Sequence, residues 1–316
     1  MASLINALPG AVAQGLIWGI MAIGVYLTYR ILDIADLTVD GSLGTGGAVC
    51  IMLMLTGHNV WVSLAGAVIA GMLAGLVTGI LNTFMGIPAI LSGILTQLSL
   101  YSVNLKIMGK ANQAINVDKF DLLVSLRFIR KVSFYKNTIF VVAVGIILLI
   151  LILYWFFGTE LGSSLRSTGS NPNMSRAQGI NTNFTTVLGL MLSNGLVALS
   201  SALLAQYQGF ADVNMGRGAI VIGLAAVIIG EVIFGKLFHN FALKLLTVVF
   251  GAMLYYLVYQ VVIWLGLNTD DMKLITALIV AVFLALPYWK GKYFRVKPAK
   301  SLSKPESKLE GGDHNA

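Results

Sequence analysis

The feature that most restricts how this chain can fold is a set of long, uninterrupted apolar runs. Residues 138–157 read TIFVVAVGIILLILILYWFF, without a single charge. Roughly 20 such residues are needed for a helix to cross the hydrocarbon core of a bilayer. The runs lack the strict alternation of a membrane barrel. Because backbone groups in lipid must be satisfied within each span, the sequence predicts an all-α polytopic membrane protein.

Composition agrees with this class, since 57% of the residues are hydrophobic and 11% are charged, against about 25% charged in soluble proteins. We expect about eight to ten transmembrane helices within a membrane domain of residues 1–289. The first residues carry no positive charge, which argues against a cleaved signal peptide. Residues 290–316 are basic and rich in Lys, Ser and Pro, so we predict a disordered tail. Candidate spans are residues 9–28, 44–56, 60–85, 89–108, 138–157, 184–205, 219–229, 241–265 and 274–289.

Two polar, glycine-containing breaks interrupt the spans. The first reads YRILDIAD and then TVDGSLGTGG, and the second reads YQGFAD and then VNMGRG. Polar groups at membrane depth are costly and commonly line a water path. We therefore predict a translocation path. The alternative is that these groups only cap helices and pair with one another within the fold; Thr38 or Asp40, for example, could cap the helix that follows the first break. The predicted path residues are Thr38, Asp40, Ser42, Gln208, Asp212 and Asn214.

Other polar residues near the breaks have simpler expected roles. Asp33 and Asp36 can pair with Arg30, which would lower the cost of burying them. In the fourth span, Gln97, Tyr101, Ser102 and Asn104 should face protein or a water path.

The two breaks resemble each other, which suggests an internal repeat. If Asp36 is aligned with Asp212, the third span falls on the eighth and the fourth falls roughly on the ninth. The fifth span is then the odd crossing that inverts the second half. We therefore predict two inverted repeats with broken helices, as in transporters whose pathway lies between the halves. Gly71, Gly75 and Gly79 form a small-residue ridge on the third span, which predicts close helix packing.

A long polar interval, residues 159–181, separates the fifth and sixth spans. Asn171 followed by Pro172 is typical of a helix start, and Gly179 is suited to end that helix. A short capped helix at the membrane surface is either part of a connecting loop or a docking element for a soluble partner. Spacing alone leaves both readings open.

Lysine and arginine near the spans predict the orientation. If the C-terminal tail is cytoplasmic, the short basic loops are cytoplasmic too and the N-terminus lies outside. The basic loop of residues 110–137 then lies outside, against the rule; its mixed apolar and cationic middle suits an interfacial helix or a strand pair. The cations placed inside are Arg30, Arg166, Arg176, Lys236 and Lys244.

The polar interval, read as E-L-G-x-x-L-R-x-x-G-x-N-P-x-M-x-x-x-x-G-I-N over residues 160–181, resembles the cytoplasmic coupling loop of the branched-chain amino acid type of ABC transporter permease. The resemblance extends to TVDGSLGTGGAV, PAILSGILTQLSLYSVNLKIMGKAN and QYQGFADVNMGRGAIVIGLAAVIIGE, and covers most of the chain. It is nearest to a bacterial subgroup linked to aromatic amino acids. Arg217 is a departure, because the family more often has an uncharged residue there.

The resemblance implies a permease subunit of a bacterial ABC importer, multi-pass in the cell membrane with a cytoplasmic C-terminus. It implies a homodimer in the lipid bilayer, an ABC ATPase subunit and an extracytoplasmic substrate-binding lipoprotein, with an aromatic or branched-chain amino acid as solute. Residues 158–182 would be the coupling loop. The residues that the resemblance assigns to coupling with the ATPase are Glu160, Arg166, Gly169, Asn171, Pro172, Met174 and Gly179.

The alternatives are an ABC permease for a nucleoside or sugar, and an ion-coupled secondary transporter that uses acids near the breaks, namely Asp36, Asp40, Asp212 or Glu231. No G-x-x-x-x-G-K-S/T motif occurs, so energy must come from another subunit or an ion gradient. The isolated histidines (His58, His239 and His314) and the single Cys50 suggest no metal site. No nucleophile and base form a pattern typical of an enzyme. We expect no cofactor and no nucleic-acid partner.

Overall fold

The computed structural model describes residues 2–117, 119–120, 122–129, 137–235, 238, 240–265, 274, 277–278, 280–282 and 285, with only the backbone for residues 2–6. The predicted tail and most of the predicted ninth span lie outside these residues, as do Lys236, His239 and His314.

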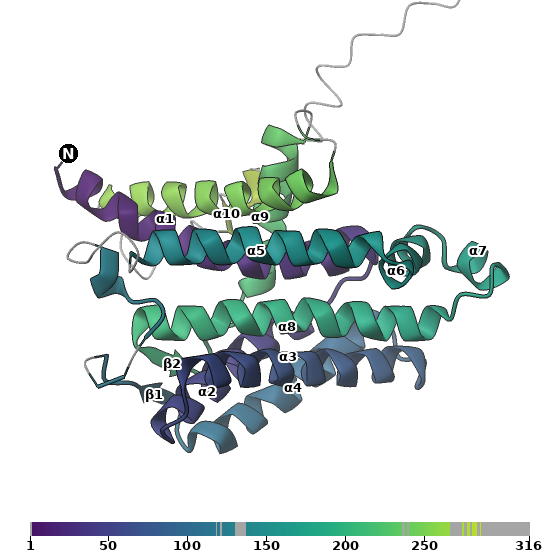
Figure 1. Ribbon diagram of the computed structural model, residues 1–316, viewed down its shortest axis with the longest axis horizontal. Coiled ribbons are helices and arrows are strands. Elements are labelled where there is room, and N and C mark those ends of the chain that lie inside the picture. Colours follow the sequence, from purple (N-terminus) through teal and green to yellow (C-terminus); the bar gives the residue numbers. More distant parts are fainter. Residues whose placement is uncertain are drawn as a thin grey trace, which may run out of the picture.

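A helix occupies each of the first eight predicted spans (Figure 1). Among the described residues, six helical segments are long and apolar enough to cross a membrane, which agrees with the predicted all-α polytopic class. The helix α9 is shorter, at 16 residues. The helices are α1 (Ala2–Tyr26), α2 (Thr38–Leu55), α3 (Val60–Thr83), α4 (Ala89–Met108), α5 (Thr138–Gly158), α8 (Thr182–Gln208), α9 (Ala219–Phe234) and α10 (Phe241–Trp264).

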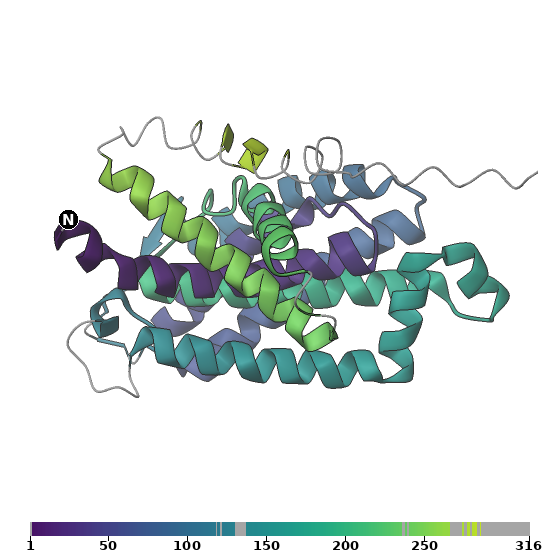
Figure 2. The same cartoon turned by 90° about the horizontal axis from the view of Figure 1, so that it is seen from above.

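The helix packing has the symmetry expected of two repeats. The predicted alignment pairs α1 with α8, α2 with α9 and α3 with α10. In the structure α3 packs along α8, and correspondingly α10 packs along α1 (Figures 1 and 2). Likewise, α2 contacts both α3 and α8, while α9 contacts both α10 and α1. The helix α5 lies outside this pairing, as an intervening crossing would.

The glycine ridge on α3 packs against α8, as predicted. A methyl group at Gly75 would lie 2.3 Å from the carbonyl oxygen of Leu190, and one at Gly71 would lie 2.4 Å from that of Asn194. Only residues without a side chain allow two helix backbones to approach so closely.

The basic loop after α4 is tied to the second break. Its strand β1 (Asn112–Ala114) pairs antiparallel with β2 (Phe210–Asp212), which follows α8 directly. The loop also contains a 3-10 turn, η2 (Leu126–Ile129). The β1/β2 ribbon lies at the opposite end of the molecule from the short helices between α5 and α8 (Figure 1).

Candidate functional site

The polar interval folds into two short helices, α6 (Glu160–Ser170) and α7 (Pro172–Ala177). The predicted start and end of α7 are confirmed: the Asn171 side chain accepts a hydrogen bond from the backbone N–H of Met174 at 3.1 Å, and Gly179 has a φ of +82°. The sequence prediction missed α6. Its signal is Thr159, whose hydroxyl accepts a hydrogen bond from the backbone N–H of Gly162 at 3.4 Å and so caps that helix.

Two of the predicted coupling residues brace α6 within the chain. A methyl group at Gly169 would lie 1.8 Å from the carbonyl oxygen of Ile31, so α6 rests directly on the backbone at the end of the first span. The guanidinium of Arg166 donates to the carbonyl oxygen of Phe157. It also lies over the rings of Phe157 and Phe241, at 5.5 and 5.0 Å from their centroids. Arg166 therefore links α6 to both α5 and α10.

Side-chain hydrogen bonds hold α7 to its neighbours. The hydroxyls of Ser167 and Ser175 lie 2.7 Å apart and join α6 to α7. Arg176 Nε donates to the hydroxyl of Thr182 at 2.8 Å, which joins α7 to the start of α8. These two bonds attach α7 to α6 and to the long helix α8.

The outer surface of α7 is exposed. The Met174 side chain is 59% exposed, and Pro172 and Asn171 are exposed beside it. Figure 1 shows α7 at the far end of the molecule, beyond the ends of the long helices. Glu160 is also exposed, at the start of α6. Of the predicted coupling residues, Pro172 and Met174 form the free tip, whereas Asn171 and Gly179 shape it.

The first break is closed by a buried polar network. A π-helical turn, η1 (Leu27–Ile31), ends the first span. The carboxylate of Asp36, 2% exposed, then accepts hydrogen bonds from the backbone N–H of Thr38 at 2.9 Å and from the Asn194 side chain at 2.7 Å. The hydroxyl of Ser42 donates to Asn194 at 2.6 Å. The structure places the predicted path residue Ser42 inside this network, which joins α2 to α8.

Thr38 belongs to the same buried region. Its hydroxyl lies 2.7 Å from that of Thr78, which donates to the hydroxyl of Thr96 at 2.9 Å. Three helices, α2, α3 and α4, therefore share one chain of hydroxyl groups. Thr38 is fully buried.

Asp40 joins the two breaks. Its carboxylate oxygens accept hydrogen bonds from the backbone N–H groups of Gly218 at 2.9 Å and Ile220 at 3.0 Å, at the start of α9. The expectation that Asp40 caps its own helix is thus wrong: it caps a helix 180 positions further along. The first N–H groups of a helix have no partner within it and favour negative charge, which explains the attraction.

The predicted path residues of the second break have hydrogen-bond partners of their own. The Asp212 carboxylate accepts from the backbone N–H of Asn214 at 2.7 Å and from the side chain of Asn112 at 3.3 Å. It therefore shapes the turn after β2 and fastens the β1/β2 ribbon. Gln208 and Asn214 are exposed. Among the described residues, the cavity that Asp40 lines does not include the other five predicted path residues.

A cavity of about 400 Å³ lies where α2, α4 and the segment before α9 meet, and Asp40 is the predicted path residue on its wall. Of the four polar residues of α4 predicted to face protein or a water path, Gln97, Tyr101 and Asn104 line this cavity, whereas Ser102 is exposed. Its polar or charged lining residues are Asp40, Gln97, Tyr101, Asn104 and Arg217.

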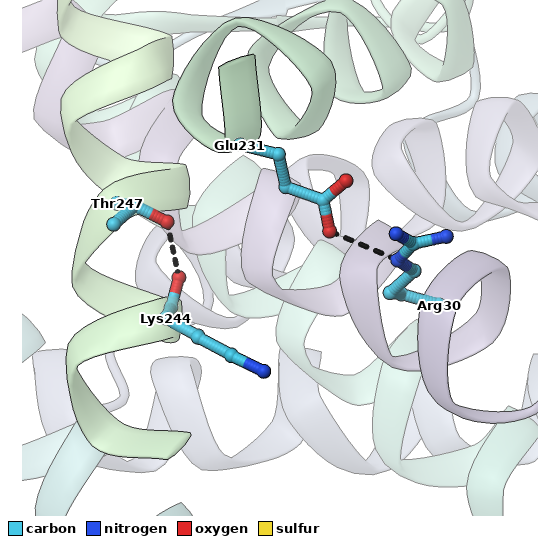
Figure 3. A network of polar contacts seen from close by, with 4 residues as sticks. All are labelled: Arg30, Glu231, Lys244 and Thr247. Atoms are coloured by element: carbon cyan, nitrogen blue, oxygen red, sulfur yellow. Dashed lines mark hydrogen bonds and ion pairs between the residues drawn. The ribbon is translucent and has the colours of Figure 1, made fainter. Parts of the chain in front are cut away.

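Arg30, in η1, forms an ion pair with Glu231 near the C-terminal end of α9. The Nε of Arg30 donates to a carboxylate oxygen of Glu231 at 2.9 Å (Figure 3). The expected pairing of Arg30 with Asp33 or Asp36 is therefore wrong. Arg30 and Lys244 also line a second cavity of about 1020 Å³ beside α6. Both ends of α9 are thus attached to the first repeat, through Asp40 and Arg30.

Among the described residues, no group of three or more His, Cys, Asp or Glu side chains is placed to hold a metal ion. Cys50 is buried, and Gln206 Nε2 lies 3.5 Å from its sulfur.

Comparisons with known proteins give one consistent family. Residues 8–286 match the family described as branched-chain amino acid transport system / permease component. A tyrosine transport system permease protein of Clostridioides difficile (strain R20291) is 39% identical over 89% of this chain and 91% of its own. An uncharacterized protein of Rickettsia prowazekii (strain Madrid E) is 35% identical over 89% and 97%. The solved structure of PsaBC from Streptococcus pneumoniae, in complex with Fab, covers 94% of this chain and 99% of that one at 18% identity, with a TM-score of 0.54, and supports the fold.

Proposed function

Because this chain belongs to the family of branched-chain amino acid transport permeases, we propose that it forms, as a homodimer, the membrane path of a bacterial importer for an aromatic or branched-chain amino acid. As a member of this family it is a permease subunit of an ABC transport system, whose partners are an ATPase and a substrate-binding protein. The cytoplasmic position of α7 and of the C-terminus is part of the proposal.

The structure of α7 is the observation that best supports a role in coupling to the ATPase. It is capped, exposed at its tip and hydrogen-bonded to both α6 and α8. A partner that pushes on Met174 would therefore move α8, and through Gly169 and Arg166 also η1 and the ends of α5 and α10. Rigid contact of this kind is what ATP-driven closure requires.

The amino-acid assignment rests on the Clostridioides difficile relative, which is named for tyrosine transport. The low charge of the predicted path also supports an amino acid as the solute. A zwitterion needs one cation and one anion to bind it, rather than a cluster of either. The binding partner would hold the solute tightly, and the permease would offer a weaker, transient route.

An ion-coupled mechanism is less well supported. Its candidate acids all have partners within the fold: Asp36 accepts from Thr38 and Asn194, Asp40 from the start of α9, Asp212 from Asn112 and Asn214, and Glu231 from Arg30. Among the described residues, no group of three or more His, Cys, Asp or Glu side chains is placed to hold a metal ion.

The test is reconstitution of the permease with its ATPase and binding lipoprotein in liposomes, measuring uptake of L-tyrosine and L-leucine. We expect uptake to require ATP and the binding protein. Met174→Asp should reduce stimulated ATP hydrolysis and uptake at least tenfold, because an exposed apolar contact with the ATPase is replaced by a charge. Its thermal stability should stay unchanged, since the side chain is exposed.

A matched control is Met191→Asp, which places the same charge in α8, within the membrane domain, and should lower stability instead. Uptake of a nucleoside or sugar with no amino-acid uptake would refute the substrate assignment. Parental coupling in Met174→Asp would refute the docking role of α7.

A further inference from the structure

The cavity between α2, α4 and the start of α9 contains polar groups that are not all paired within the fold. Its walls bring together Asp40 of α2, three polar residues of α4, and Arg217 from the turn before α9. The cavity volume of about 400 Å³ is within the range of roughly 300–1,000 Å³ typical of small-molecule sites.

Asn104 is the clearest sign that this cavity can bind a ligand. Its side chain is 1% exposed, yet its carbonyl oxygen has no hydrogen-bond partner among the described residues. Leaving a buried polar atom unpaired costs free energy, so this amide oxygen beside a cavity is available to accept a hydrogen bond from a bound group. Gly44 keeps space for this amide, because a methyl group there would lie 2.9 Å from Asn104 Nδ2.

Arg217 supplies a cation to the same cavity. Among the described residues, its side chain has no ion-pair partner within 4 Å, although Asp40 lines the cavity with it. The Asp40 carboxylate is engaged by two backbone N–H groups, but each of its oxygens retains a lone pair for another donor. The cavity thus presents one guanidinium, one carboxylate and one unpaired amide.

We infer that this cavity is a transient binding station for a zwitterionic α-amino acid on its way through the permease. Arg217 would receive the carboxylate of the amino acid, since guanidinium and carboxylate are matched in geometry. The ammonium group would donate to Asn104 and Asp40. Leu98 and Tyr101, which also line the cavity, offer an apolar and aromatic surface for a large side chain. The inference rests on the proposed function and adds the residues that contact the solute.

The position of the cavity suits such a station. Val213, next to the β1/β2 ribbon, also lines it, and Asp40 within it caps α9, whose far end is paired with Arg30 near α6. A solute bound there touches the residue that joins the two repeats. Movement of α9 against α2 would therefore change the station directly.

The first experiment uses the reconstituted complex with its ATPase and binding protein, and L-[³H]tyrosine as the probe. Asn104→Leu and Arg217→Gln should each lower tyrosine uptake at least tenfold while ATP hydrolysis stimulated by the loaded binding protein stays within twofold of the parent. Retained hydrolysis shows that the variants fold and assemble. Ser99→Leu and Lys106→Gln, on the exposed surface of α4, are the matched controls and should transport normally.

The second experiment measures occupancy without transport. In a Cys50→Ala background, Asn104→Cys should react with a small polar maleimide, and millimolar L-tyrosine should slow this reaction at least threefold, whereas a dicarboxylate or a nucleoside should not. Parental uptake in both cavity variants, or labelling that tyrosine leaves unchanged, would overturn the station while the importer function stands. Failure of the parental complex to import any amino acid would overturn both.

Discussion

Gly169 shows at the scale of one residue how the coupling segment is attached. It lies against the backbone of Ile31 and Leu32, where even a methyl group would be too close. The end of the first span and α6 therefore touch without an intervening side chain. Gly158, on the same face of the molecule, has open space around it.

We predict that Gly169→Ala pushes α6 away from the end of η1. Overpacking of this kind costs about 1–3 kcal/mol, and the better helix propensity of alanine offsets about 1 kcal/mol or less of it. The apparent Tm of the purified permease should fall by a few degrees, and stimulated ATP hydrolysis should fall more strongly. Gly158→Ala is the control and should leave both unchanged; equal behaviour of the two variants would contradict the close contact.

At the scale of elements, polar groups from another segment stabilise each broken helix by hydrogen bonds. The start of α9 is capped by Asp40 of α2, and the linker before α2 is held by Asn194 of α8. These bonds are buried or partly buried, whereas the Arg30–Glu231 pair has side chains that are 57% and 32% exposed. An exposed pair of this kind typically contributes less than about 1 kcal/mol, so the buried network dominates the stability of the breaks.

Asn194→Leu should test that network. The substitution roughly keeps the side-chain volume but removes one of the two hydrogen bonds to the Asp36 carboxylate, the one to its Oδ2, and the acceptor of the Ser42 hydroxyl. A buried polar group left without a partner costs about 1–3 kcal/mol, and more when it is charged. Thermal unfolding in detergent should therefore show a clear loss of stability. Asn59→Leu, at an exposed position, is the control; a parental melting curve for Asn194→Leu would mean that the network contributes little.

At the scale of the whole molecule, the two ends of the bundle differ in structure. One end carries α6 and α7, and the other carries the β1/β2 ribbon (Figure 1). The paired packing of α3 on α8 and of α10 on α1 places the broken helices between the repeats. Which end faces the cytoplasm depends on how the protein is inserted in the membrane.

We predict that single cysteines at the two ends label from opposite sides of the membrane. In a Cys50→Ala background, Ala114→Cys should react with an impermeant maleimide in intact cells, because it lies exposed on the ribbon. Met174→Cys should react only in inside-out vesicles. The Cys50→Ala protein, without other cysteines, measures the background; labelling of both positions from one side would contradict the proposed orientation.

The sequence by itself determined the features that depend on composition and on near neighbours. Apolar run length placed the spans, because the thickness of the bilayer sets that length. Asn171, Pro172 and Gly179 defined α7, because capping involves residues three or four positions apart. The spacing of Gly71, Gly75 and Gly79 predicted a packing surface, although it did not name the partner helix.

Only the tertiary structure decided which distant polar groups meet. Asp40 and Ile220 are 180 positions apart, and Asp36 and Asn194 are 158 apart. Each acid had several possible partners in the sequence, and helix packing chose among them. The same packing buried Thr38 and Ser42, and placed Asn104 and Arg217 on one cavity. The physical reason is that a hydrogen bond acts over about 3 Å, whereas the order of residues along a chain does not fix distances between its helices.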